Sequence, residues 1–264
     1  MMYSKVFTAG TVLVFVMSLP VGLKAQESET SDLKDMSDPL AVYTRAAVGV
    51  TNRGINIKLG IESKDGDADK ALMNVLEIKG IGGDVIGWDG DYLRSNSVDS
   101  LRYRYFSLNK KNGRGSQMDV TYDRNQESGV VSYSFLQGLP KWKNFNLYPL
   151  LGAGLAYANN ALQDDGSFQS GLSVPGALAV VGMYGKYTVN ETIWLNYNPF
   201  WSVGLLGSDN FMDHGFEGHS SVLTHEVAVS YKLSSRSNVR YFANWSQHTN
   251  FDDGVHRIEY NYQF

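Results

Sequence analysis

Near the end of the chain, serine, histidine and aspartate lie close together, and these residue types can form a hydrolytic site. Ser246, His248 and Asp252 or Asp253 would supply a nucleophile, a base and an orienting acid. In an extended strand, however, Ser246 and His248 project from one face about 6.6 Å apart, which is beyond direct hydrogen-bond reach. We therefore expect no catalytic residues and no enzyme, and a lipid-modifying enzyme remains only the third functional hypothesis.

Metal-binding residues are also poorly placed for a site. The chain has no cysteine, and His214, His219 and His225 lack the spacing of metal ligands. An acidic run at 65–69 begins like a calcium loop, but the glycine and glutamate that such a loop requires do not follow. The sequence predicts neither a bound metal nor a cofactor.

Charged and polar residues recur at regular intervals along the chain. In the final segment, 257–264, every second residue is apolar, and arginine, glutamate, asparagine and glutamine stand between them. This period of two indicates β-strands, and similar runs bounded by turn residues predict about twelve of them. The predicted strands are 40–52, 54–64, 71–81, 98–109, 115–125, 128–138, 144–158, 175–190, 191–206, 220–234, 236–248 and 254–264.

Two all-β architectures fit such a pattern. A soluble sandwich turns its apolar faces inward, whereas a transmembrane antiparallel up-and-down barrel turns them to lipid and keeps its charges inside. The polar faces here carry charges in mid-strand, and the opposite faces carry the aromatic residues. Long irregular segments at 82–97, 159–174 and 207–219 alternate with short turns such as 189–191 and 234–237. Both features favour the barrel, with the long loops at the cell surface.

The N-terminal region has a different composition. Lys5 precedes an apolar run from Val6 to Leu19 that is too short to span a membrane, so we interpret residues 1–25 as a secretory signal peptide. Residues 26–39 are acidic and nearly devoid of apolar side chains, which predicts a flexible periplasmic tail before a barrel at 40–264. The formal net charge of −4 argues against a nucleic-acid partner, because such binding needs a basic face.

The chain ends on Tyr260, Tyr262 and Phe264, which alternate with polar residues. This ending resembles the assembly signature of Gram-negative outer-membrane β-barrel proteins. The resemblance implies recognition by the barrel-assembly machinery, location in the cell outer membrane, and contact with membrane lipid and lipopolysaccharide. Twelve strands in a chain of this length also resemble the small monomeric porins that pass acidic oligosaccharides.

If the apolar faces point to lipid, the charged side chains face the lumen. The predicted inward set is Arg45, Lys58, Glu62, Glu77, Arg102, Arg104, Asp119, Lys186, Glu226, Lys232, Arg240, Arg257 and Glu259. This set contains more bases than acids, so one interpretation is a pore that favours small polar or anionic solutes. The alternative is a structural or surface-interaction barrel whose lumen is closed by salt bridges. Inward aromatic residues at Phe106, Trp194, Phe200 and Phe242 fit either a sugar-stacking track or simple filling of the lumen.

Overall fold

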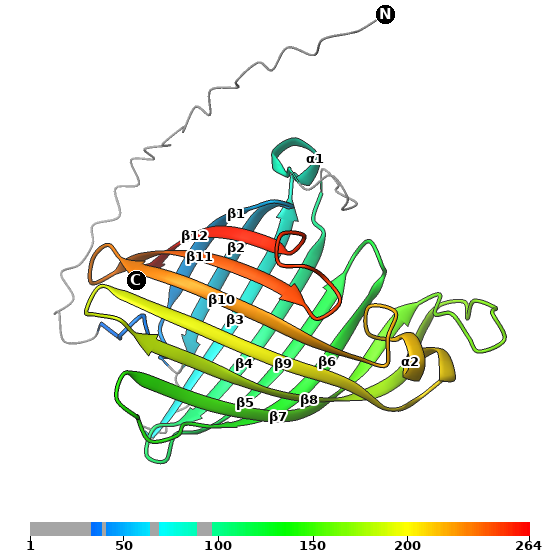
Figure 1. The fold of residues 1–264 in the computed structure, drawn as a ribbon, viewed down its shortest axis with the longest axis horizontal. Helices are drawn as coiled ribbons and strands as arrows, with labels where there is room; N and C mark the ends of the chain where they lie inside the picture. Colours follow the sequence, from blue (N-terminus) through cyan, green and yellow to red (C-terminus); the bar gives the residue numbers. More distant parts are fainter. Residues whose placement is uncertain (1–32, 39–40, 64–68, 89–96) are drawn as a thin grey trace, which may run out of the picture. The chain divides into compact units, whose positions relative to one another are not determined.

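Twelve antiparallel strands close into a barrel, in which each strand pairs with its sequence neighbours and β1 also pairs with β12 (Figure 1). The strands are β1 Arg45–Thr51, β2 Gly54–Ser63, β3 Lys70–Ile81, β4 Ser100–Asn109, β5 Arg114–Asp123, β6 Ser128–Gln137, β7 Phe145–Asn159, β8 Leu172–Thr188, β9 Ile193–Gly207, β10 Ser221–Lys232, β11 Ser237–Ser246 and β12 Val255–Gln263. The predicted all-β class and up-and-down barrel are confirmed.

The structure is a computed structural model that describes residues 33–38, 41–63, 69–88 and 97–264. The predicted signal peptide and residues 26–32 and 39 of the predicted tail lie outside this range. Two short helices, α1 Gly83–Ile86 and α2 Asp209–His214, occupy the longer loops and were not predicted. In α2, the Ser208 hydroxyl accepts a hydrogen bond from the backbone N–H of Phe211, which fixes the start of the helix. Among the described residues, no helix is long and apolar enough to cross a membrane.

The two faces of the barrel wall differ in polarity. Large apolar side chains such as Leu59, Leu151 and Ile258 are exposed on the outer face, while Lys58 and Glu259 are buried on the inner face. Strand alternation produces this division, because successive side chains point to opposite faces. The arrangement is the reverse of a soluble protein and matches a wall that faces hydrocarbon.

The two ends of the barrel are also different. We call the end where β1 begins and β12 finishes the terminal end, and the end that carries α1 and α2 the loop end (Figure 1). Val42 packs with Met73 and Val75 inside the terminal half. Phe211 and Phe216 pack with inward residues of β8 and β10 near the loop end. Between these two apolar clusters lies a layer of charge.

Candidate functional site

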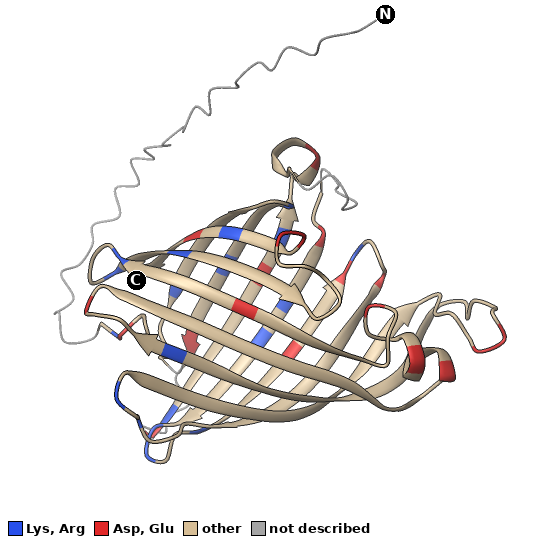
Figure 2. Cartoon of the chain, viewed as in Figure 1, with Lys and Arg blue, Asp and Glu red and all other residues tan. Residues whose placement is uncertain are grey.

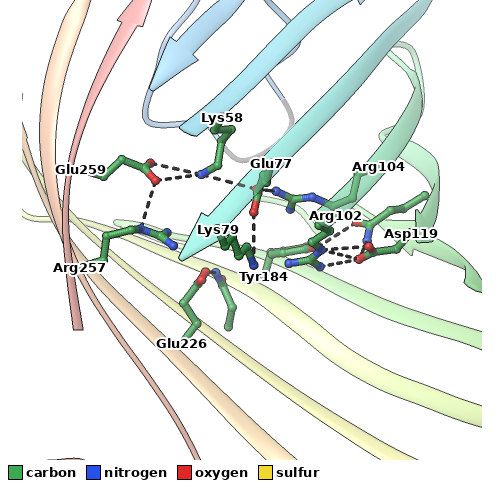
Figure 3. Close-up of polar contacts among 12 residues, drawn as sticks. Lys58, Glu77, Lys79, Arg102, Arg104, Asp119, Tyr184, Glu226, Arg257 and Glu259 are labelled. Atoms are coloured by element: carbon green, nitrogen blue, oxygen red, sulfur yellow. Dashed lines mark hydrogen bonds and ion pairs between the residues drawn. The ribbon is translucent and has the colours of Figure 1, made fainter. Parts of the chain in front are cut away.

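Glu77 is the centre of the charged layer, which we call the charged belt (Figure 3). It projects inward from the middle of β3 and is only 4% exposed. One carboxylate oxygen lies 3.7 Å from Nζ of Lys58, and the other lies 3.4 Å from Nζ of Lys79. The guanidinium of Arg104, on β4, also donates to this carboxylate. One acid therefore neutralises part of the charge on three bases from three adjacent strands.

On one side, the belt continues from β2 to β12 across β1. Glu259 has an oxygen 3.1 Å from Nζ of Lys58 and 3.1 Å from Nε of Arg257. The Arg257 side chain passes over Gly49 of β1, where an added Cβ would lie 2.8 Å from its Cδ. A residue without a side chain is needed there because the Arg257 side chain lies against the β1 backbone.

On the other side, the belt continues to β5. Nε of Arg102 donates to Oδ1 of Asp119 at 2.9 Å, and a second guanidinium nitrogen bonds the other carboxylate oxygen. Gln117 donates to Asp119 at 3.2 Å and accepts from the hydroxyl of Tyr184, on β8, at 2.9 Å. The described ion pairs of the belt therefore run along the wall from β12 through β1 to β5, and each joins strands no more than two places apart.

The facing wall carries fewer charges (Figure 2). Asn198 donates to Glu226 at 2.8 Å, so the Glu226 carboxylate is held by an amide. Arg240 donates to Ser230 at 2.9 Å and to Asn196 at 2.7 Å, which are neutral partners. Charge is thus unevenly distributed around the lumen.

Positive charge is in excess in the middle of the lumen, whereas the cavity lining toward the two ends adds Arg53 and the acids Asp38, Asp99, Asp123 and Glu217. The bases of the belt and its surroundings are Arg45, Lys58, Lys79, Arg102, Arg104, Arg240 and Arg257, and the acids are Glu77, Asp119, Glu226 and Glu259. Within the part of the chain that the structure describes, no acid lies within 4.0 Å of the Arg45 or Arg240 guanidinium, because none of the ion pairs there includes either residue.

A cavity of about 820 Å³ runs beside the belt. Its lining includes Asp38 and Val42 at the terminal end, most residues of the belt, and Phe216 and Glu217 at the loop end. The cavity therefore reaches residues from both ends of the barrel.

The predicted inward residues do not all lie together. Arg45, Lys58, Glu77, Arg102, Arg104, Asp119, Glu226, Arg240 and Arg257 line the cavity, and Glu259 is buried behind them. Lys186 is buried at the terminal end, while Glu62 is half-buried and Lys232 exposed near the ends of their strands, away from the belt. Lys79 is a belt residue that the sequence analysis missed, because the glycines from Gly80 onward obscure the alternation in β3.

The inward aromatic residues have different surroundings. Phe106, Trp194, Phe200 and Phe242 all line the cavity, and of these Trp194 and Phe242 are buried. Arg257 and Arg240 lie 4.1 and 4.6 Å from the centre of the Phe242 ring, so this ring is covered by cations. Phe242 supports the basic side chains, and its face is not free to stack on a sugar.

The residues considered for hydrolysis do not form a catalytic arrangement. The Ser246 hydroxyl donates to the Glu217 carboxylate and accepts from the backbone N–H of His248 at 3.1 Å. Nε2 of His248 lies 3.1 Å from the carbonyl oxygen of Ser221, and the His248 ring stacks on His219 with centroids 3.6 Å apart. The base is therefore not directed at the serine. Among the described residues, no group of three His, Asp or Glu side chains is placed to hold a metal ion.

The last strand presents its aromatic residues outward. Tyr260, Tyr262 and Phe264 are exposed on the outer face, and the backbone N–H of Phe264 donates to the carbonyl of Thr44 at 3.1 Å. The end of β12 is thereby fixed to the chain just before β1, next to the closure of the barrel. Recognition of these residues during assembly stays a prediction.

A closed twelve-stranded barrel with an apolar outer face and a charged interior has the architecture of the outer-membrane channels. Among solved structures, the chain resembles the NanC porin, with a TM-score of 0.54, 9% identity, and coverage of 84% of this chain and 98% of that one. It also resembles an outer membrane channel from Pseudomonas putida F1, with a TM-score of 0.56, 10% identity, and coverage of 90% and 100%. The likeness is one of fold, and it confirms the resemblance to small porins at that level. No protein-family model matches the sequence, and no curated protein matches it significantly.

Proposed function

We propose that the protein is a passive channel of the outer membrane for small polar or anionic solutes. The course of the ion pairs carries this proposal. Salt bridges that close a lumen would join opposite walls, whereas those of the charged belt follow the wall from β12 to β5. The cavity beside them touches residues at both ends of the barrel.

The preference for anions rests on the excess of bases in the middle of the lumen. Lining charges set the selectivity of a pore, and Arg45 and Arg240 have no acid partner among the described residues. A carboxylate or phosphate passing along the lumen would meet these two guanidinium groups. The charged interior gives no comparable contact to an apolar solute.

A channel of the outer membrane would have defined contacts with the membrane around it. The apolar outer face would contact membrane lipid, and the loops at the loop end would face lipopolysaccharide. Neither contact depends on the identity of the solute. The acidic-oligosaccharide class suggested by the sequence resemblance belongs to this proposal as one kind of anionic solute.

A structural or surface-interaction barrel is the second candidate, and one observation favours it. Phe211 and Phe216, from the loop that carries α2, are buried in the barrel against Leu178 and Val222. They reduce the opening at the loop end. If this loop seals the lumen, the protein would be a closed barrel without transport.

Conductance in planar lipid bilayers separates the two candidates. The channel proposal predicts stable current steps, with a reversal potential in a salt gradient that is shifted toward anions. Replacing Arg45 and Arg240 together by Gln should reduce this shift, because two positive charges leave the lining. No acid loses an ion-pair partner in this variant. A matched control is Lys141→Gln, which removes an exposed charge from the turn between β6 and β7. Silence from protein that migrates as a folded, heat-modifiable barrel would refute the channel proposal.

A further inference from the structure

Residues 33–38, which we call the N-terminal segment, lie against the inner wall at the terminal end. The backbone N–H of Lys34 donates to Oε1 of Gln263 at 3.2 Å, and Nε2 of Gln263 lies 3.5 Å from the carbonyl oxygen of Lys34. Asn238 of β11 lies next along the wall, with its amide nitrogen 3.6 Å from Sδ of Met36. The start of the segment is therefore held by β12 and β11.

The rest of the segment is bound by β8 and β7. Nζ of Lys186 lies 3.6 Å from Oδ2 of Asp35 and also donates to the Ser37 hydroxyl. The Tyr148 hydroxyl donates to Oδ1 of Asp38 at 3.2 Å. The segment thus carries two acids, one facing a lysine and one facing a tyrosine of the wall.

These contacts fix the path of the chain. In the twelve-strand ring, β12 and β7 are five places apart, which is nearly opposite. A segment bound to β12 at Lys34 and to β7 at Asp38 must therefore cross the opening. Val42 then packs on Met73 and Val75 of β3, on another part of the wall, before β1 begins.

Burial of the rim residues supports this path. Gln263 and Asn238 lie at the ends of their strands, where an open mouth would leave polar side chains in water, yet they are 1% and 2% exposed. The Lys186 side chain is likewise buried. Met36, Ser37 and Asp38 line the same cavity as the charged belt. The segment covers the rim and forms part of the channel wall.

We infer that the N-terminal segment is a constriction of the terminal mouth, and that Asp35 and Asp38 determine charge selection there. The inference rests on the proposed channel function. Asp35 offsets the positive charge of Lys186, and Asp38 adds a negative charge to the lining. An anion that has passed the basic belt is repelled by the negative charge at this mouth, so the segment reduces the preference for anions. Because the segment also narrows the mouth, it limits the current.

Docking of the segment is tested first, with a readout that needs no transport. Because the chain has no cysteine, Lys34→Cys gives a single site for a nitroxide spin label. The Lys34 side chain is exposed while its backbone is bound to Gln263, so the label should leave the contacts intact. In the barrel reconstituted in vesicles, we expect restricted motion of the label. Lys186→Gln should release it, and Lys141→Gln at the same end should not.

Channel recordings then test the constriction. Deletion of residues 33–38 should raise the single-channel current and shift the reversal potential toward anions, because two acids leave and Lys186 stays. Lys186→Gln should also raise the current, but with a smaller shift, because a base is lost from the wall. Asp35→Asn combined with Lys186→Gln should have no more effect than Lys186→Gln alone, since both remove one contact.

The outcomes separate this inference from the channel proposal. A freely mobile label in the unmodified protein would overturn the docking and with it the constriction. A restricted label and a conducting channel whose current is unchanged by the deletion would overturn the constriction alone. A restricted label with no current from any variant would refute the channel proposal itself, and the inference would fall with it.

Discussion

Glu77→Gln is the substitution that tests the charged belt most directly. Glutamine has nearly the same size and shape as glutamate, so the change removes charge without leaving a cavity. Lys58, Lys79 and Arg104 would then face one another without their shared acid. We expect a less stable barrel and a channel with stronger preference for anions.

The size of the effect follows from the contacts. At 3.7 and 3.4 Å, and with an effective dielectric constant of about 20, each lysine is attracted to Glu77 by about 4–5 kcal/mol. Desolvation of the buried charges offsets a large part of this attraction. Removing one partner of a buried ion pair costs about 3–5 kcal/mol, and this is the loss in the free energy of unfolding that we expect.

Urea unfolding of the barrel in lipid vesicles measures this loss, with tryptophan fluorescence as the signal because Trp194 is buried inside the barrel. Glu62→Gln is the matched control, since Glu62 is an inward acid of β2 without an ion pair among the described residues. It should change the unfolding free energy by less than about 0.5 kcal/mol.

If Glu77→Gln unfolds at the same urea concentration as Glu62→Gln, the belt is fully hydrated and its ion pairs do not hold the wall together. A normal stability combined with unchanged ion selectivity would also remove Glu77 from the channel lining.

Further predictions address the faces, the assembly, the sidedness and the pH response of the barrel. Ile258→Arg, at an outward site that is 62% exposed, should cost about 2–4 kcal/mol in the urea assay if it lies near the bilayer midplane, and no loss would place this face outside lipid. Deletion of Phe264 should lower the amount of heat-modifiable barrel in the outer membrane without blocking export, and normal amounts would contradict its role in assembly. A cysteine at Asp165 should react with a membrane-impermeant thiol reagent on intact cells and one at Ser235 should not, whereas the reverse pattern would invert the topology. Burial raises the pKa of Asp35, but hydrogen bonds with Ser37 and the charge of Lys186 outweigh burial and lower this pKa below its ordinary 3.8. Docking of the N-terminal segment is therefore stabilised above pH 3.8 and lost as the pH falls below it, so the current should rise there, and Asp35→Asn should abolish this rise.

The strands were predictable because alternation is a local property. In β12, the polarity of each residue from Arg257 to Gln263 predicts the face on which it lies. The structure places the polar residues inward and the apolar residues outward. The prediction over 71–81 also agrees with β3, although Gly80 and the glycines that follow the strand obscured the inward position of Lys79. Where both faces are apolar, as at Leu178 and Val180 of β8, polarity alone does not show that these residues turn inward under the loop of α2.

Contacts between distant residues were beyond such reasoning. The pair of Lys58 and Glu259 depends on the closure of β1 onto β12, and the Arg257 side chain beside it depends on the absence of a side chain at Gly49. Residues 33–38 are acidic and short of apolar side chains, which predicts a flexible tail. Their binding depends on Lys186, Tyr148 and Gln263, which are brought to one mouth only by the closed ring.

The unequal lengths of the strands have a consequence for the approach to the barrel from outside. β8 contains 17 residues and β11 contains 10. At about 3.3 Å per residue and a tilt of about 40°, they rise about 43 and 25 Å, against an apolar band of about 25 Å. The rim is therefore oblique, high over β7 to β9 and close to the membrane surface over β11 and its neighbours. If the protein is the proposed channel with its loop end at the cell surface, a solute held among the headgroups of the outer leaflet would reach the lumen more directly across the low rim than over the high one.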